Sequence, residues 1–422
     1  MMNFILRGSV CYSKSPTELV TLEKGYVVCK DNVCEGVYTE IPEAYKAYPV
    51  KDCGERIIIP GMADLHTHAP QYTFRGLGMD KELLDWLNAY TFPEEAKYED
   101  EGYARQAYQK FASDLKQTTT TRACIFGTIH PHSTEILMEQ LEATGLITYV
   151  GKVNMDQNAP DYLCESSAAE SVIATEKWIN TVQSKFKNTK PMITPRFVPS
   201  CSGELLEKLH DVQEKYQLPV QSHLSENMGE IQLVQELFPQ SSCYADVYHQ
   251  YGLIDKECKT VMAHCVYCSE EEMKLLKENQ VYVAHCPESN ANLASGIAPI
   301  RKYMEHHIPI GLGSDVAAGS KLSIFYAMQD AIVMSKMRWR LVDNSLAPLT
   351  FEEAFYLATK GGGSFFGKVG SFEPGYEFDA VILDDKNLET LLQLSIKERA
   401  ERMMYLADDR NIVGKYVAGK EV

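Results

Sequence analysis

Short apolar, β-branched runs alternate with amphipathic helical stretches through the middle of the chain. Continuous apolar runs are typical of buried parallel strands, and the stretches between them carry helix signals such as the capping box of Ser269 and Glu272. Eight strand-then-helix units within roughly 300 residues predict an α/β fold, a (β/α)8 TIM barrel. An open doubly wound sheet is the alternative, because it shows the same alternation. The eight runs are Ile57–Ile59, Thr121–Phe126, Ile147–Val153, Pro191–Val198, Leu218–Ser222, Thr260–Ala263, Val281–Ala284 and Ile308–Leu312.

Both ends of the chain show a different pattern, with short strands and turns and few helix signals. Residues 25–38 predict a β-hairpin around the turn pair Asp31-Asn32. Two further strands are expected at 378–383 and 412–417. We therefore expect a small β-sandwich domain formed from residues 1–58 and 372–422, and the (β/α)8 barrel over residues 59–371.

The charge balance argues against two classes of partner. The 422 residues carry a formal net charge of -17, and such a negative field repels phosphate backbones and anionic membrane surfaces. The apolar run that opens the chain, Met1–Leu6, is interrupted by Arg7 and is too short for a signal peptide. No stretch approaches the roughly 18 apolar residues of a membrane span. We expect a cytoplasmic protein that binds neither nucleic acid nor membrane.

Twelve cysteines are scattered through apolar strands, without a secretion signal. This distribution favours reduced, buried thiols over disulfides. The one close pair, Cys265 and Cys268, follows an apolar strand without a second pair beside it. Core packing is therefore the favoured interpretation of this pair, with a redox or metal motif as the alternative. No glycine-rich phosphate-binding element follows any of the strands, which excludes the usual nucleotide cofactors.

Six of the 11 histidines stand at or just beyond the carboxyl ends of predicted strands. In a barrel these ends converge on one face, so that residues distant in sequence meet around one point. Asp315 follows the last strand and completes the group. The six histidines are His66, His68, His130, His223, His264 and His285.

His66 and His68 lie two residues apart on a strand, so both imidazoles point to the same side and can hold one ion. His223 offers a third imidazole, His264 a fourth and Asp315 a carboxylate. Nitrogen and oxygen ligands without a thiolate suit zinc, with iron as the second choice, and leave a position open for water.

Glu226 stands three residues beyond His223, where its carboxylate can reach a metal-activated water. That position suits a proton shuttle, although Ser225-Glu226-Asn227 is also a plausible helix cap. His130 and His132 are better explained by a structural role than by metal binding. His285 is either a pocket residue or a histidine satisfied within the core, and both interpretations remain open.

Several stretches resemble the guanine deaminase family of the amidohydrolase superfamily, and together they cover nearly the whole chain. A histidine pair alone marks only the superfamily, whereas Pro70-Gln71-Tyr72 and Pro195-Arg196-Phe197 are what narrow the resemblance to guanine. The matching stretches are Pro60–Phe74, Leu84–Pro93, Thr194–Phe197, Gln221–Asn227, Val261–His264, Gly311–Val316 and Tyr405–Ile412.

The resemblance implies hydrolysis of guanine to xanthine and ammonia by a metal-activated water, and a homodimer. It implies one Zn²⁺ per subunit, or Fe²⁺, because Met192–Arg196 lacks the lysine that bridges two metals in binuclear relatives. Glu226 would then be the acid/base, with His264 and Asp315 orienting the water. The implied metal ligands are His66, His68, His223 and Asp315; the implied substrate-binding residues are Gln71, Trp86, Arg196, Phe197, His223, Glu226 and Asp315.

Two other functions remain open from the sequence. The same metal set serves aminohydrolases acting on adenosine-like, cytosine-like or triazine substrates. Some relatives are scaffold proteins without catalysis, but these typically lose metal ligands, and every expected ligand is present in this chain.

Overall fold

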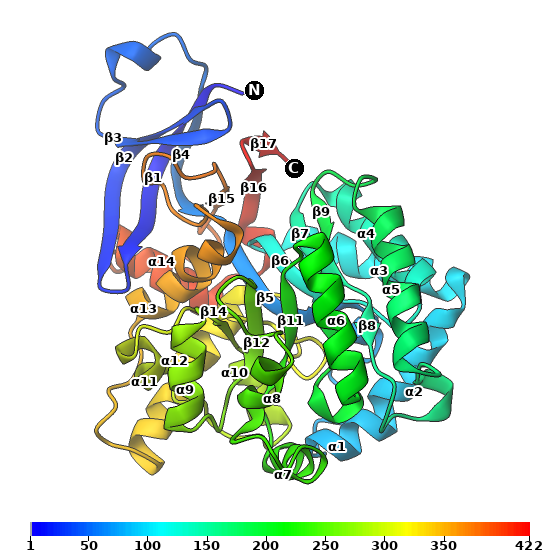
Figure 1. Ribbon diagram of the computed structural model, residues 1–422. Helices are drawn as coiled ribbons and strands as arrows, with labels where there is room; N and C mark the ends of the chain where they lie inside the picture. The colour runs from blue at the N-terminus through cyan, green and yellow to red at the C-terminus, as the bar shows by residue number, and fades with distance from the viewer. Residues whose placement is uncertain (1) are drawn as a thin grey trace.

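Eight parallel strands form a closed barrel at the centre of the structure, a computed structural model that describes residues 2–422 (Figure 1). The hydrogen-bonded order is β11-β12-β13-β14-β5-β6-β7-β9, and a parallel bridge between Ile193 and Val220 closes the ring. This is the α/β architecture predicted from the alternating pattern. The strands are β5 (Met62–His68), β6 (Thr120–Phe126), β7 (Ile147–Gly151), β9 (Thr189–Pro191), β11 (Val220–Leu224), β12 (Thr260–His264), β13 (Tyr282–His285) and β14 (Ile310–Leu312), with β8 (Val153–Asn154) and β10 (Thr194–Pro195) paired beside them.

One of the eight predicted strands was assigned to the wrong sheet. Residues Ile57–Ile59 belong to β4 (Val50–Pro60), which pairs with β15 in a second sheet, and the first barrel strand is β5. An apolar β-branched run fits either sheet equally well. The true barrel strand, β5, includes the polar residues Asp64, His66 and His68. Its polar composition does not indicate a buried strand, although every position of it is buried.

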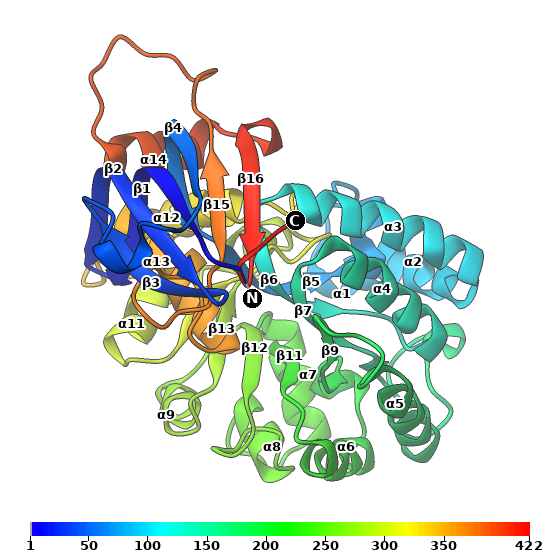
Figure 2. The ribbon, with the colours of Figure 1, turned by 90° about the horizontal axis from the view of Figure 1, so that it is seen from above.

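Helices surround the barrel in a ring, as the view from above shows (Figure 2). Several helices begin at side-chain caps, including the predicted capping box of Ser269 and Glu272. The main helices are α3 (Glu101–Gln117), α4 (Pro131–Thr144), α5 (Ala168–Val182), α6 (Gly203–Tyr216), α7 (Met228–Leu237), α8 (Tyr244–Gln250), α9 (Glu270–Glu278), α10 (Pro287–Asn292), α11 (Ile300–Glu305), α12 (Ile324–Leu341), α13 (Phe351–Tyr356) and α14 (Ile396–Leu406).

The two ends of the chain meet in one seven-stranded sheet of order β17-β16-β15-β4-β1-β2-β3. The predicted hairpin is present, and its turn residues Asp31 and Asn32 have φ of 51° and 70°, as a tight turn between antiparallel strands requires. Met1, which opens the apolar run noted in the sequence, lies outside the described residues. The strands are β1 (Phe4–Ser15), β2 (Glu18–Lys30), β3 (Val33–Tyr38), β15 (Ala380–Leu383), β16 (Ile412–Val417) and β17 (Lys420–Glu421), besides β4.

This terminal sheet is joined to the barrel through buried charged side chains. The Arg122 guanidinium on β6 donates to both carboxylate oxygens of Asp379, at 2.6 and 2.9 Å, and to Glu377 at 2.9 Å. Nearby, the Lys415 amine donates to the backbone carbonyls of Lys116 and Thr120, at 2.6 and 3.0 Å. Buried polar groups that all have partners stabilise a fixed contact between the two parts.

All twelve cysteines are free thiols and ten of them are buried. Cys265 and Cys268 pack within the main apolar core, which supports the packing interpretation of this pair. Over residues 2–422, the structure contains no helix with the length and apolar character needed to cross a membrane.

Candidate active site

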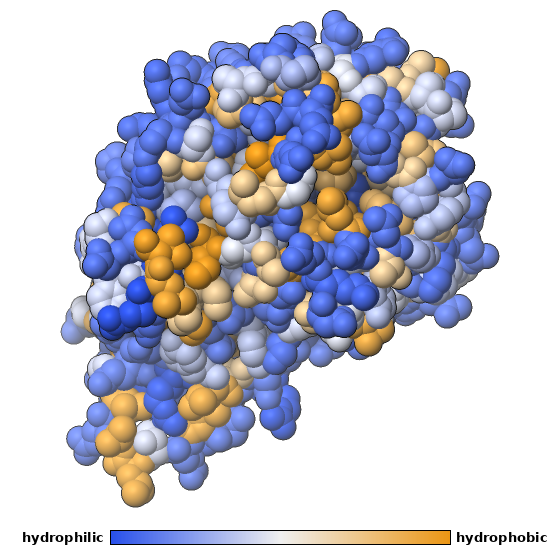
Figure 3. Space-filling view, turned by 90° about the horizontal axis from the view of Figure 1, so that it is seen from below, coloured by the Kyte–Doolittle hydropathy of each residue, from blue (hydrophilic) through white to orange (hydrophobic). Residues whose placement is uncertain are grey.

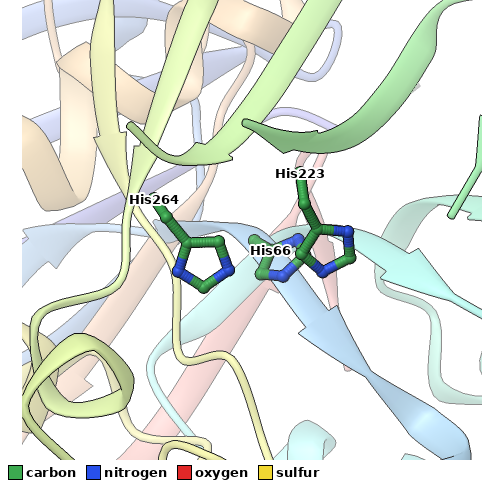
Figure 4. Close-up of side chains that lie close together, drawn as sticks. All are labelled: His66, His223 and His264. Atoms are coloured by element: carbon green, nitrogen blue, oxygen red, sulfur yellow. The ribbon is translucent and has the colours of Figure 1, made fainter. Parts of the chain in front are cut away.

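Three histidines converge at the carboxyl ends of the barrel strands. The Nε2 atoms of His66 and His68 on β5 lie 3.2 Å apart, and the Nε2 of His223 on β11 lies 3.2 Å from that of His68. Figure 4 shows His66 and His223 turned toward one another, with His264 of β12 beside them. The two-residue spacing on β5 therefore places both imidazoles on one side of the strand, as predicted.

Asp315 joins this cluster from the turn after β14. Its Oδ1 lies 3.2 Å from His66 Nε2 and 3.5 Å from His68 Nε2. The turn packs tightly against β5, because a Cβ on Gly313 would lie 2.9 Å from the Cβ of His66. Asp315 itself has φ of 44°, a conformation that costs energy in a residue with a side chain and that the surrounding contacts must maintain.

These residues fit a divalent metal ion. Four atoms held about 2.0–2.1 Å from a tetrahedral ion lie roughly 3.3–3.4 Å apart, close to the separations just described. Burial lowers the pKa of His66, His68 and His223, although the Asp315 carboxylate opposes this shift for His66 and His223, and the lower pKa favours the neutral form that binds metals. The Arg196 carbonyl lies 2.6 Å from Nδ1 of His223, so it accepts the proton on that nitrogen and leaves Nε2 free.

Other ligand combinations are geometrically close. His66, His223 and His264 form one group of potential ligands, and His66, Cys286 and Asp315 form another. The Cys286 thiol donates to the Ala284 carbonyl at 3.4 Å, and burial raises its pKa well above the usual value. A protonated thiol directed at the backbone is a poor metal ligand, so the imidazole and carboxylate set is the better site.

Glu226 and His264 stand beside the cluster and face each other. Their Oε2 and Nε2 atoms are 3.4 Å apart, and His264 Nε2 lies 3.8 Å from Asp315 Oδ2. Ser295 donates to Glu226 Oε1 at 3.1 Å, and Nδ1 of His264 lies 2.9 Å from Asn290 Oδ1. Each side chain is thus oriented by one hydrogen bond, while His264 Nε2 has no hydrogen-bond partner.

The pKa values at this point are strongly shifted. Burial raises the pKa of Glu226 to about 7. Burial alone would raise the pKa of Asp315, but His66 and His264 outweigh it and lower that pKa to about 2. For His264, burial lowers the pKa, and the carboxylates of Glu226 and Asp315 more than compensate and raise it. Two carboxyl groups with separated pKa values suit one permanent anion and one proton carrier.

A cavity opens directly onto the cluster, and the empty space in it and at its mouth is about 410 Å³, open solvent included. It lies at the end of the barrel seen in Figure 3, where groups of apolar side chains occur among hydrophilic ones. All of the substrate-binding residues predicted from the sequence line it. They are Gln71, Trp86, Arg196, Phe197, His223, Glu226 and Asp315, together with His68 and His264.

Some residues of the cavity were not predicted. Its apolar wall also includes Leu83, Leu87, Leu293 and Ala318, which look like ordinary core residues in the sequence. Behind the wall, the buried Glu95 bonds to both Arg196 and Gln71. Glu95 follows a stretch that resembles the family, but an isolated glutamate in a helical segment gives no signal of burial.

The remaining histidines lie away from the cavity. The exposed His132 side chain is 3.1 Å from Glu101, while the buried Nε2 of His130 has no partner. His285 is buried at the end of β13 without lining the cavity, and burial lowers its pKa to about 3. Its Nδ1 also lacks a partner, so His285 lies in the core but is not fully satisfied there.

Comparisons with known proteins agree with this geometry. The model of the amidohydrolase family matches residues 57–422, so the chain belongs to the amidohydrolase family. Guanine deaminase of Dictyostelium discoideum is 37% identical over 98% of this chain and 91% of its own length. Guanine deaminase of Mus musculus is 39% identical over 86% of this chain and 82% of its own.

The solved structures point the same way. A guanine deaminase from C. acetobutylicum with bound guanine superposes with a TM-score of 0.96 at 47% identity, over 100% of both chains. An adenosine deaminase from Xanthomonas campestris, at 21% identity and a TM-score of 0.83, shares the fold. The resemblance to guanine deaminases inferred from the sequence motifs is thereby confirmed.

Proposed function

We propose that this protein is an enzyme that hydrolyses guanine to xanthine and ammonia. The observation that carries the proposal is the convergence, on one small cavity, of a hydrolytic cluster and of two buried polar side chains, Arg196 and Gln71. The extensive similarity to guanine deaminases supports the choice of base. Scaffold relatives typically lose metal ligands, whereas this chain keeps every residue of the cluster, which argues against the scaffold alternative.

We assign one metal ion per subunit to His66, His68, His223 and Asp315, with Zn²⁺ as the first choice and Fe²⁺ as the second. A divalent ion there supplies an activated water, because coordination lowers the pKa of water to about 7. The short distances among the four ligand atoms support this set. His264 is left outside it, since its Nε2 faces the Glu226 carboxylate, 3.4 Å from Oε2.

Glu226 acts as the proton carrier. As a carboxylate it takes a proton from the attacking water, and as a carboxylic acid it donates that proton to a ring nitrogen. It then takes the second proton, from the hydroxyl added to carbon 2, and donates it to the amine, which departs as ammonia. A pKa near 7 makes both forms available at neutral pH. His264 and Asp315, whose Nε2 and Oδ2 atoms lie 3.8 Å apart, orient the water toward carbon 2 of the base.

The base lies between the hydrolytic cluster and the apolar wall. Arg196 donates to the carbonyl of guanine, which adenine lacks, and Gln71 bonds to the ring edge. Phe197 and Trp86, both almost fully buried, pack against the base. A site built around such hydrogen bonds rejects an analogue without the partner group by roughly 10⁴–10⁵.

Ammonia release, together with the ultraviolet change from guanine to xanthine, tests the proposal directly. Adenosine, cytosine and a triazine are assayed in parallel, because related aminohydrolases act on such compounds. We expect turnover of guanine to exceed that of each of the others by at least about 10³. Faster turnover of any of them would overturn the assignment.

We also propose that the enzyme is a cytoplasmic homodimer, with a β-sandwich domain at 1–58 and 372–422 and a hydrolase barrel at 59–371. Twelve free thiols suit a reducing compartment. Exposed apolar side chains on and just beyond α12, namely Val333, Met337, Leu341 and Val342, offer a surface for a second copy. A separate core that includes Tyr12, Phe372 and Phe378 supports the domain division. Light scattering of the purified protein would test the dimer.

A further inference from the structure

We propose that Glu95 is a positioning residue that orients both purine-binding side chains, Arg196 and Gln71, and thereby sets which base the cavity accepts. The inference rests on the proposed guanine chemistry and adds a residue that does not line the cavity. Glu95 lies on α2 (Phe92–Ala96) and is 1% exposed. Its role would be exerted entirely through the two side chains it holds.

A single carboxylate connects the two side chains. Its Oε2 accepts from Arg196 Nη1 at 2.6 Å, and its Oε1 accepts from Arg196 Nη2 at 3.1 Å. The same Oε1 accepts from Gln71 Nε2 at 3.0 Å. Arg196 is 3% exposed and Gln71 is 2% exposed, so bulk water reaches little of either side chain. Charge-assisted, bidentate bonds of this kind restrict direction as well as adding energy.

These bonds determine which hydrogen-bonding groups remain for a ligand. A guanidinium has five N–H donors, and Glu95 uses two of them, so the other three lie in a fixed plane. For Gln71, the carboxylate demands the NH₂ group on its side, and the amide oxygen then accepts from the Ala317 N–H at 3.3 Å. The reversed amide would place its oxygen against a carboxylate oxygen. Glu95 therefore determines that hydrogen-bond donors of Arg196 and Gln71 lie together at one place on the cavity wall.

The helix that carries Glu95 also supports the face of the guanidinium. The Phe92 ring lies 5.3 Å from the Arg196 guanidinium carbon, in a cation–π arrangement. Phe92 and Glu95 are three residues apart and so share one face of the helix. The preceding turn, Leu87–Thr91, is a widened π-helical turn, consistent with Pro93 having no N–H to donate to the turn before it.

A purely structural role for Glu95 makes a different prediction. A buried ion pair that only stabilises the fold would, when broken, weaken all ligands equally. A positioning role weakens most those ligands that accept from the oriented Arg196 donors. 2-Aminopurine separates the two cases, because it has the ring and the 2-amino group of guanine but no carbonyl at carbon 6.

The experiment is steady-state kinetics of Glu95→Gln with guanine, with 2-aminopurine as a competitor. We expect KM for guanine to rise on the order of 10- to 100-fold, with a smaller fall in kcat. The inhibition constant of 2-aminopurine should change less than about threefold. If Glu95→Gln does not fold, Glu95→Asp takes its place, because it retains the charge with a shorter side chain. Its KM for guanine should rise above that of the wild type, by a smaller factor than is expected for Glu95→Gln.

The matched control is Glu94→Gln. Glu94 precedes Glu95 on the same helix, is 7% exposed, and bonds to Lys97 and Thr73 on the side away from the cavity. Its replacement should leave KM and the inhibition constant unchanged. A double-mutant cycle with Arg196→Ala adds a second readout, because a residue that acts through Arg196 should have a reduced effect once Arg196 is absent.

Two results would overturn the inference. One is an equal loss of affinity for guanine and 2-aminopurine in Glu95→Gln, and the other is a fully additive cycle with Arg196→Ala. If the wild-type protein releases ammonia from guanine, either result counts against Glu95 alone. If the wild-type protein does not act on guanine, both this inference and the proposed function are contradicted.

Discussion

The mouth of the barrel and the junction with the terminal sheet both bury charged side chains, but they treat them in opposite ways. At the junction, Arg122 reaches two carboxylates, with three hydrogen bonds of 2.6 to 2.9 Å. At the mouth, imidazole nitrogens face one another at 3.2 Å, and the buried Nε2 of His264 has no hydrogen-bond partner. At the junction the charged groups are fully hydrogen-bonded to one another, whereas at the mouth of the barrel nitrogen atoms remain available to bind a ligand.

The contrast indicates which buried polar groups serve chemistry. A saturated ion pair fixes geometry and has no capacity left for a ligand. A group of neutral imidazoles, a permanent carboxylate and a carboxyl of raised pKa is unfavourable until a ligand arrives, and such groups concentrate at functional sites. Substitutions at the mouth should therefore remove activity, and substitutions at the junction should remove stability.

The largest effect is expected from His223→Ala. Loss of one of three imidazoles should release the metal and lower kcat/KM for guanine by about 10⁴-fold or more, since the activated water is lost with it. Metal analysis and ammonia release measure the two effects. The exposed His132 provides the control, because His132→Ala should retain both metal and activity. A His223→Ala protein with full metal content would refute this ligand assignment.

Glu226→Gln tests the proton carrier with the ligands intact. The amide keeps the shape but cannot transfer the proton, so kcat should fall by about 10³-fold while the metal content stays the same. The exposed Glu236 lies on the following helix, α7, and Glu236→Gln should have normal kinetics. Normal turnover in Glu226→Gln would mean that another group carries the proton.

Arg122→Met addresses the other side of the comparison. It leaves Asp379 buried without its main partner, and breaking such a pair should lower the free energy of unfolding by about 3 kcal/mol. The kcat for guanine should remain within twofold of wild type, because Arg122 lies at the opposite end of the barrel strand from the cluster. Denaturant unfolding followed by circular dichroism measures the first effect. A large loss of kcat in a folded variant would contradict the division of roles.

The smallest effect is the pH dependence contributed by Lys415. Burial lowers the pKa of this amine to about 7, from 10.5 in the unfolded chain. Between these values the unfolded state binds more protons, so the contribution of Lys415 to stability rises with pH and is lost as pH falls through 7. A neutral amine still has two N–H donors, enough for its two carbonyl partners.

Lys415→Met should remove that dependence. Between pH 7 and pH 9 the free energy of unfolding of the wild type should rise by about 2 kcal/mol relative to the variant. Urea titrations of both proteins at several pH values measure the difference. Parallel pH profiles for the two proteins would show that the amine remains charged in the folded state.

Much of the candidate site could be predicted because many of its residues belong to short sequence motifs. His66 and His68 lie two residues apart on one strand, and Glu226 follows His223 by three residues, so short-range geometry already restricts their directions. The structure brings these residues together with Asp315, and places all predicted substrate-binding residues on one cavity. Glu95 could not be predicted, because its burial depends on Arg196, 101 residues further along the chain.

By itself, the amino-acid sequence determined the alternation of strands and helices, the set of candidate metal-binding side chains and the membership of a family. Those features depend on spacing and residue type, which act over a few positions. Tertiary structure alone decided that Ile57–Ile59 joins the terminal sheet, that the barrel closes between Ile193 and Val220, and that Glu95 lies behind Arg196. An apolar run or a lone carboxylate suits many environments, and only the packed chain selects one of them.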